Sequence, residues 1–143
     1  MHTVIRPYVK ADAPEWARMR TALWPDHTEI DMAAWLARGD TAVLVAERGR
    51  GALCGFAEVG ERSYADGCNT SPVAYLEGWY VDPDVRRRSI GTQLVHAVEA
   101  WARARGYREL ASDTQLENLI SQAAHQRLGF EEAERSVLYR KAL

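Results

Sequence analysis

The spacing of apolar residues divides the chain into helices and strands. Trp16, Met19 and Leu23 recur at three- and four-residue intervals, which predicts an amphipathic helix. Asp12 and Glu15 flank the start of this helix and are expected to form a capping box there. Pro14 fits the first turn of the same helix. The helix is expected to end near residue 24.

Three further helices and six strands follow from similar patterns. The helices are expected over residues 29–38, from the basic turn at 86–91 to residue 105, and over 118–128. The strands are expected over residues 3–6, 41–46, 52–59, 73–81, 109–113 and 137–141. Residues 61–72 follow neither pattern and are expected to form a mobile loop.

The order of these elements predicts the fold class. Strand 73–81, the helix after it and strand 109–113 form a strand-helix-strand unit. Such crossovers are right-handed and join parallel strands, so part of the sheet is expected to be parallel. We therefore predict an α/β (α+β) fold for residues 1–143, one domain with a mixed central sheet. Ligands of such sheets usually bind beyond the carboxyl ends of the strands.

A basic turn follows the central strand and precedes the longest helix. It contains Arg86, Arg87, Arg88, Ser89 and Gly91. The first amides of a helix have no internal partner, and the helix dipole adds positive potential, so this turn is suited to a phosphate or pyrophosphate. A nucleotide P-loop is excluded because the chain contains no Gly-Lys pair. A solvated basic turn without a ligand is the structural alternative.

Composition narrows the possible functions. The 143 residues are 47% hydrophobic and 27% charged, as in an ordinary globular domain, and the net charge of −2 argues against nucleic-acid binding. Cys54 and Cys68 are too far apart for a metal or redox motif, and no metal site is expected. The sequence contains neither an evident signal peptide nor a run of membrane-spanning length, which predicts a cytoplasmic protein without membrane contact.

The strand, the basic turn and the helix together resemble the acetyl-CoA loop of the GCN5-related N-acetyltransferases (GNAT). Arg86 and Gly91 match the family pattern, and Ser89 replaces its first glycine. This replacement is tolerable if residue 89 has an ordinary backbone conformation, in which the serine hydroxyl could serve as a helix cap. The resemblance implies a splayed central strand flanked by four helices, and acetyl-CoA as cosubstrate. The residues implied in cofactor binding are Trp79, Tyr80, Val81, Arg86, Arg87, Arg88, Ser89, Ile90, Gly91, Thr92 and Asn118.

Acetylation of an amine requires removal of a proton, because an alkylammonium of pKa about 10 is almost fully protonated near pH 7. Glu77 lies in the central strand and is predicted to orient a water molecule or the ammonium. The alternative is a strand carboxylate paired with an arginine. His125 stands where the family often has the tyrosine that protonates the leaving thiolate, so it is a candidate acid. A packing role, or simple contact with the cofactor, remains open for His125.

Four strings resemble one branch of the family, the aminoglycoside 6'-N-acetyltransferases. They are residues 23–26, 76–81, 111–114 and 124–130. This resemblance implies an aminoglycoside acceptor, antibiotic resistance and a homodimer. Several carboxylates suit a polycation, and aromatic rings suit sugars or cations. The predicted substrate-binding residues are Trp24, Asp26, Tyr64, Glu77, Trp79, Asp113 and Glu117, and the predicted catalytic residues are Glu77, His125 and Asp113.

Other functions remain open from the sequence. A GNAT enzyme could acetylate another small amine or a protein N-terminus instead. A non-catalytic acyl-CoA or drug-binding protein is the alternative of a different class, supported by the departures from the family pattern at Ser89 and His125. Neither cysteine has a histidine partner in sequence, so direct transfer without an acetyl-enzyme is expected.

Overall fold

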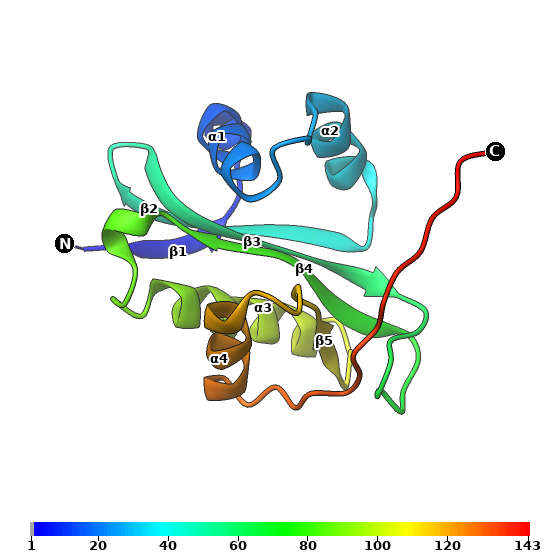
Figure 1. Cartoon of the computed structure of the whole chain (residues 1–143). Helices are drawn as coiled ribbons and strands as arrows, with labels where there is room; N and C mark the ends of the chain where they lie inside the picture. The colour runs from blue at the N-terminus through cyan, green and yellow to red at the C-terminus, as the bar shows by residue number, and fades with distance from the viewer. Residues whose placement is uncertain (1) are drawn as a thin grey trace.

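Five strands form one mixed sheet in the order β1-β2-β3-β4-β5 in the computed structural model, which describes residues 2–143 (Figure 1). The first four strands pair antiparallel, and β4 and β5 pair parallel. The parallel pair confirms the predicted strand-helix-strand crossover. The strands are β1 (Val4–Pro7), β2 (Thr41–Gly49), β3 (Ala52–Arg62), β4 (Val73–Val81) and β5 (Leu110–Ser112).

Helices cover both faces of the sheet. Figure 1 shows α1 and α2 on one face and α3 and α4 on the other. Short 3-10 turns, η1 (Lys10–Asp12) and η2 (Pro83–Val85), precede α1 and follow β4. The four helices that were expected are therefore present. They are α1 (Ala13–Leu23), α2 (Glu29–Ala37), α3 (Ile90–Ala104) and α4 (Leu119–Arg127).

The core contains one large cluster on each face of the sheet and a smaller third cluster of Ala65, Val73 and Tyr75. On the α3 face, Leu94, Val95 and Val98 are fully buried against β2, β3 and β4. On the α1 face, Trp16 and Met19 are fully buried. Burial of these side chains is the main favourable contribution to folding, at about 25 cal/mol for each Å² of apolar surface. The apolar periodicity of both helices is thus explained by their packing on the sheet.

The central strand separates from its parallel neighbour half-way along its length. The pairing of β4 with β5 covers only Ala74 to Leu76, opposite Leu110 to Ser112. Beyond Leu76, the described strands pair with β4 only on its β3 side, so the backbone of Glu77–Val81 has an edge without a strand partner. The splayed central strand that the family resemblance implied is confirmed.

The expected capping box at Asp12 is wrong. The Asp12 side chain makes no cap bond to the helix. Its carboxylate instead accepts hydrogen bonds from both terminal nitrogens of Arg6, each at 2.8 Å, and from the Val9 amide at 2.8 Å. The start of α2 has the reciprocal arrangement, in which Thr28 and Asp31 each accept the other's backbone amide.

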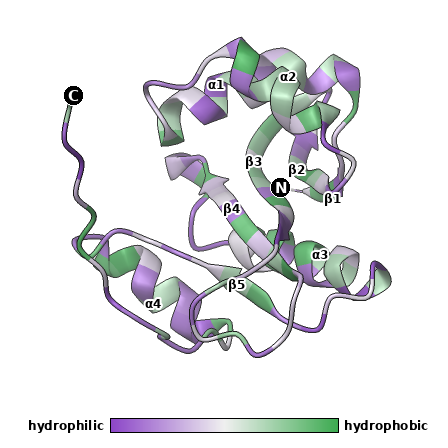
Figure 2. Cartoon of the chain, turned by 90° about the vertical axis from the view of Figure 1, so that its right-hand side faces the viewer, coloured by the Kyte–Doolittle hydropathy of each residue, from purple (hydrophilic) through white to green (hydrophobic). Residues whose placement is uncertain are grey.

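The last predicted strand is also wrong. Residues 131–143 form no strand, and Val137, Leu138 and Tyr139 are exposed. Figure 2 shows this segment projecting away from the helices and the sheet. A β-rich pattern alone does not make a strand, because a segment without a neighbouring strand has no ladder of hydrogen bonds. We call residues 131–143 the C-terminal tail.

The loop after β3 is linked to the rest of the domain by several contacts. β3 itself continues to Arg62, so the loop begins later than expected. The Glu109 carboxylate accepts hydrogen bonds from the amides of Asn69 and Thr70, at 2.8 and 2.7 Å. Ala65 is buried. This loop therefore contacts the entry to β5, at the end of the sheet opposite to the splayed part of β4.

Candidate active site

A bulge in β4 places Glu77 beside the point where the sheet splays. Glu58 of β3 pairs with Gly78, and the next residue, Val59, pairs with Leu76, so Glu77 is the additional residue. A bulge of this kind changes the face to which the following side chains point. Glu77 thus lies on the same side as Tyr75, whereas the indole of Trp79 lies in the core cluster of the α3 face.

Glu77 is paired with an arginine that the sequence analysis did not name. Arg62 donates from Nε to Glu77 Oε2 at 2.8 Å and from Nη2 to Oε1 at 2.7 Å. The arginine pairing considered as an alternative for Glu77 is therefore present. The side chain of Glu77 is 24% exposed, and that of Arg62 is 44% exposed. Solvent reaches this pair, so it does not exclude a contact between Glu77 and a ligand.

Asp113 lies close to the same pair. The Arg62 guanidinium carbon lies 3.5 Å from the centre of the Tyr75 ring, and the Tyr75 hydroxyl donates to Asp113 Oδ2 at 2.5 Å. Burial, together with the bond to Asp113, raises the pKa of Tyr75, so its hydroxyl stays protonated and remains a donor. The structure thus brings the predicted pair Glu77 and Asp113 to one region, with one arginine and one tyrosine between them.

Trp24 covers the central strand next to Glu77. A side-chain carbon added to Gly78 would lie 2.5 Å from the Trp24 ring, so only glycine fits this position without displacement of the ring. The guanidinium of Arg20 lies 4.8 Å from the centre of the Trp24 ring. Trp24 packs partly in the core on the α1 face, as its structural interpretation expected, and is half-buried.

A buried ion pair supports the position of Trp24. Arg20 Nε donates to Glu58 Oε1 at 2.7 Å, and Trp16 Nε1 donates to the same oxygen at 3.1 Å. Burial raises the pKa of Glu58, while the bonds to Arg20 oppose that change. A buried charge is tolerated only when it is paired and hydrogen-bonded, so Arg20 and Glu58 are a structural unit.

His125 lies on the opposite face, next to Trp79. The two rings meet edge to face, with centres 5.3 Å apart. Trp79 Nε1 donates to the Gly91 carbonyl at 3.1 Å, which links β4 to the first turn of α3. The Trp79 side chain therefore lies away from Glu77 and Trp24, and its role as a surface for the acceptor remains a prediction.

The ring nitrogens of His125 both have partners. Nδ1 lies 2.8 Å from the Ser121 carbonyl, which can only accept, so this nitrogen carries a proton. Nε2 lies 2.9 Å from Ser112 Oγ, and Ser112 Oγ lies 3.3 Å from the Leu76 carbonyl. The Ser112 hydroxyl can donate to Nε2 of the neutral ring, or accept from Nε2 of the charged ring while it donates to Leu76. This arrangement can exchange a proton at the end of β5.

The basic turn has the shape of an anion-binding loop, with Ser89 in an unexpected conformation. Arg87 and Ser89 have φ angles of 64° and 66°, in the left-handed region. The ordinary conformation on which the replacement of glycine by Ser89 was expected to depend is therefore absent, and the serine side chain makes no cap bond. Left-handed residues in a turn direct successive amides to one side and so form an anion-binding concavity. The glycine of the family pattern is explained by this conformation, which costs other residues about 1–2 kcal/mol.

The first turn of α3 contributes amides to this loop. The helical ladder begins with the bond from the Gln93 amide to the Ser89 carbonyl at 2.9 Å. The amides of Ile90, Gly91 and Thr92 precede it and have no acceptor within the helix. The Ile90 side chain is buried, so only its backbone is available to a ligand. Arg87 and Arg88 are exposed beside these amides.

Arg86 contacts the end of the central strand. Its Nε donates to the Val81 carbonyl at 2.9 Å, and its guanidinium lies 5.9 Å from the centre of the Tyr80 ring. Arg86 therefore holds the strand and the turn together in this structure. Arg88 also lines a hollow of about 240 Å³ with His2, Thr3, Ile90 and Gln93. This hollow adjoins the anion-binding turn.

The remaining predicted site residues are exposed. Asp26 lies in the turn between α1 and α2, and Glu117 lies in the turn before α4. Tyr64 is 66% exposed and donates a hydrogen bond to Asp66. The Asn118 side chain accepts from the Ser121 amide at 3.0 Å and so caps α4. Their predicted binding roles remain predictions.

Comparison with known proteins agrees with this geometry. Residues 11–130 match the acetyltransferase (GNAT) family. The chain belongs to this family. It is 44% identical to the aminoglycoside N(6')-acetyltransferase type 1 of Klebsiella aerogenes, over 98% of this chain and 97% of the relative. The aminoglycoside N(6')-acetyltransferase type 1 of Stenotrophomonas maltophilia is also 44% identical, over 97% of this chain and 93% of the relative.

Solved GNAT structures share the fold over the whole chain. The structure of AAC(6')-Iy in complex with the bisubstrate analogue CoA-S-monomethyl-acetylneamine superimposes with a TM-score of 0.91, at 41% identity, over 100% of both chains. AAC(6')-Ih from Acinetobacter baumannii superimposes with a TM-score of 0.90, at 38% identity, over 99% of both chains. The α/β GNAT fold predicted from the sequence is confirmed.

The residues missed in this GNAT domain are those that support others. Arg62, Tyr75, Ser112, Arg20 and Glu58 each contact a predicted site residue or pack beside one. Alternation along β4 does place Tyr75 and Glu77 on one face, which was a usable signal. The contact of Arg62, at the end of β3, with Glu77 could not be predicted from the sequence, because it depends on the register of β3 and β4.

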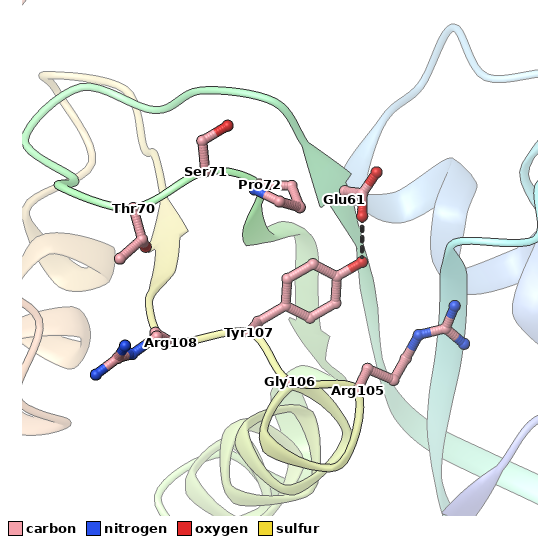
Figure 3. Close-up of a pocket in the computed structure, with 8 residues that line it drawn as sticks. All are labelled: Glu61, Thr70, Ser71, Pro72, Arg105, Gly106, Tyr107 and Arg108. Carbon is pink, nitrogen blue, oxygen red and sulfur yellow. Dashed lines mark hydrogen bonds between the residues drawn. The ribbon is translucent and has the colours of Figure 1, made fainter.

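A second hollow lies at the opposite end of β4. It has a volume of about 560 Å³ and is lined by Glu61, residues 70–72 and residues 105–108 (Figure 3). Figure 3 shows the Tyr107 hydroxyl directed to Glu61, to which it donates at 2.7 Å. None of the predicted site residues lines it. In residues 2–143 there is no helix long and apolar enough to cross a membrane, and no group of three potential metal ligands.

Proposed function

We propose that this GNAT protein transfers the acetyl group of acetyl-CoA to the 6'-amine of an aminoglycoside, and thereby confers resistance. The observation that carries the proposal is the position of Glu77 and Asp113 beside the splayed edge of β4, the strand that leads into the anion-binding turn. An acyl donor with a pyrophosphate and an acceptor with several ammonium groups match these two regions. The sequence identity to curated 6'-N-acetyltransferases supports the same activity.

The anion-binding turn would hold the pyrophosphate of acetyl-CoA. The free amides of residues 90–92 and the adjacent Arg87 and Arg88 supply donors and positive charge. Residues 79–81 present a strand edge without a partner strand on the β5 side, which suits the amides of the pantetheine arm. Acetyl-CoA supplies the activated acetyl group; the chain positions it.

The acceptor would bind on the face where Glu77 and Asp113 lie. Their carboxylates suit an alkylammonium, and Trp24 forms an aromatic wall over Gly78. We propose that Glu77 orients the amine, directly or through water, and that its proton leaves along that contact. Asp26, Tyr64 and Glu117 would contact the more distant ammonium groups and hydroxyls.

His125 would supply the proton that the leaving thiolate takes up. Its Nε2 faces the Ser112 hydroxyl at the end of β5, on the face that contains Trp79. The charged ring would pass its Nε2 proton to Ser112 Oγ, while the Ser112 hydroxyl turns from the Leu76 carbonyl and gives its own proton to the thiolate; the Ser121 carbonyl keeps Nδ1 protonated throughout. Ser112 therefore fixes the ring orientation, as partners of catalytic histidines commonly do.

The direct test is turnover of amines with acetyl-CoA, measured by release of free thiol. Kanamycin is expected to react, with one acetyl group added at the 6'-amine by mass spectrometry. Spermidine and a peptide with a free N-terminus are the comparison amines. Faster acetylation of either than of kanamycin would contradict the proposed acceptor, and cofactor binding without any product would favour a non-catalytic role.

Two substitutions test the division of roles. Glu77→Gln is expected to lower kcat about 100-fold, because loss of a positioned proton acceptor typically costs that much, while the KM for acetyl-CoA stays nearly constant. Arg88→Ala is expected to raise the KM for acetyl-CoA about tenfold, since a charge-assisted contact contributes roughly 1.5–3 kcal/mol, with little change in kcat. Glu61→Gln, at the hollow of Figure 3, is the control. Equal changes in both parameters for both variants would refute the division.

We also propose that the enzyme is a cytoplasmic homodimer. Cys54 and Cys68 are unpaired, as expected in a reducing compartment. The C-terminal tail carries exposed Val137, Leu138 and Tyr139, and α4 exposes Leu119 and Ile120. A strand-like segment that finds no partner in its own chain is suited to pair with a second copy.

A further inference from the structure

The acceptor face already contains a cation that belongs to the protein. The guanidinium of Arg62 makes two parallel hydrogen bonds to both oxygens of Glu77, at 2.8 and 2.7 Å. It also lies over the Tyr75 ring, whose hydroxyl is bonded to Asp113. One guanidinium therefore occupies the carboxylate that the proposed function assigns to the ammonium of the acceptor.

The geometry makes this pair replaceable. Arg62 is the last residue of β3, and its side chain is 44% exposed. Ion pairs in contact with solvent contribute little net stability, because water and salt compensate the separated charges. The stacking on Tyr75 gives the guanidinium a second favourable contact that does not depend on Glu77. An incoming ammonium can thus take the place of Arg62 without leaving a buried charge unpaired.

We propose that Arg62 is a specificity-determining counter-cation that competes with the acceptor ammonium for Glu77. It neutralises Glu77 in the free enzyme and is displaced when a cationic amine binds. The affinity for the acceptor is then set by the difference between two interaction free energies, that of the acceptor ammonium with Glu77 and that of Arg62 with Glu77. This inference rests on the proposed role of Glu77 as the acceptor carboxylate.

Kinetics of Arg62 variants test the competition. Arg62→Gln removes the charge and is expected to lower the KM for kanamycin about two- to fivefold, the range that corresponds to an exposed ion pair. Both kcat and the KM for acetyl-CoA are expected to stay within about twofold of the unmodified enzyme. Arg62→Lys keeps the charge but loses the second hydrogen bond and the planar stacking, so its KM for kanamycin is expected to lie between the values for Arg62→Gln and the unmodified enzyme. A merely structural role would lower kcat or thermal stability in both variants.

Arg38 provides a matched control. Its side chain is 41% exposed, is paired with Asp40 at 2.9 Å and lies 5.1 Å from the centre of the Trp35 ring, so it has the same kinds of contacts away from Glu77. Arg38→Gln is expected to leave all three kinetic parameters unchanged. If it lowers the KM for kanamycin as much as Arg62→Gln does, a general change in net charge is responsible and the proposal is overturned.

Displacement itself can be observed by NMR. The Nε–H resonance of Arg62, assigned by its loss in Arg62→Gln, is expected to shift when kanamycin is added to the CoA-bound protein and to remain unchanged with CoA alone. An unchanged resonance at saturating kanamycin, or an unchanged or higher KM in Arg62→Gln, would overturn the inference. Failure of the unmodified protein to acetylate kanamycin would instead overturn the proposed function, so the two failures are distinguishable.

Discussion

Ser89 has a backbone conformation that glycine adopts at lower cost. Its φ angle of 66° brings the Cβ atom close to the following carbonyl oxygen, and its hydroxyl makes no cap bond that would compensate. The sequence identified the turn but not this angle, because a serine is compatible with either conformation. The same limit applied to Glu77, whose arginine partner was considered but could not be identified without the register of β3 and β4.

Replacement of Ser89 by glycine is expected to stabilise the protein. The substitution removes the cost of about 1–2 kcal/mol that a non-glycine residue has in the left-handed conformation. The larger conformational entropy of glycine in the unfolded chain offsets part of this gain. The net gain is expected near 1 kcal/mol, measured by urea unfolding. Ser63→Gly is the control, because Ser63 is not among the residues with positive φ. Equal or lower stability of Ser89→Gly would mean that the turn relaxes in the serine protein.

At the scale of elements, apolar periodicity was sufficient for α1, α2, α3 and the first five strands. Hydrophobic spacing reports which face of an element is buried, and α1, α2 and α3 each contribute buried residues to the core. α4 has no buried residue, so its burial does not explain why it was predicted correctly. The contacts at the ends of the helices were less predictable. Asp12 has the residue type of a helix cap, yet Arg6 on β1, six residues earlier, binds its carboxylate. This pairing depends on how the chain turns between β1 and α1, which neither helical nor strand periodicity reports.

The pair of Asp12 and Arg6 predicts a pH-dependent stability. The bonds from Arg6 hold the pKa of Asp12 below its ordinary value. The stabilisation is therefore complete above the unfolded pKa of about 3.9 and is lost as the pH falls through the folded pKa. Asp12→Asn is expected to cost about 2 kcal/mol at pH 7 and clearly less at pH 3, by urea unfolding at both values.

The control for this pH effect is Asp40→Asn. Asp40 is paired with Arg38 at the surface, with side chains 35% and 41% exposed, so its removal is expected to cost at most about 1 kcal/mol at pH 7. The expectation for Asp12 fails if the cost of Asp12→Asn is as large at pH 3 as at pH 7. In that case the loss of stability in Asp12→Asn would be due to a change in packing.

For the whole molecule, the C-terminal tail is the part that a single chain does not explain. The β-rich pattern of residues 137–141 predicted a strand, and the structure gives an extended but unpaired segment. Strand propensity reports a conformation that suits a sheet, whereas the partner strand is decided by tertiary or quaternary contacts. Under the proposed homodimer, this segment would find its partner strand in the second copy.

Removal of the tail tests the proposed dimer. A chain of residues 1–130 keeps all five strands and all four helices. The full protein is expected to elute as a dimer in size-exclusion chromatography with light scattering, and the truncated protein as a monomer with the same secondary structure by circular dichroism. Leu138→Asp with Tyr139→Asp in the full chain is the second variant, because two charges should weaken an apolar contact without shortening the protein. A truncated protein that remains dimeric would place the interface elsewhere, and a monomeric full-length protein would overturn the homodimer.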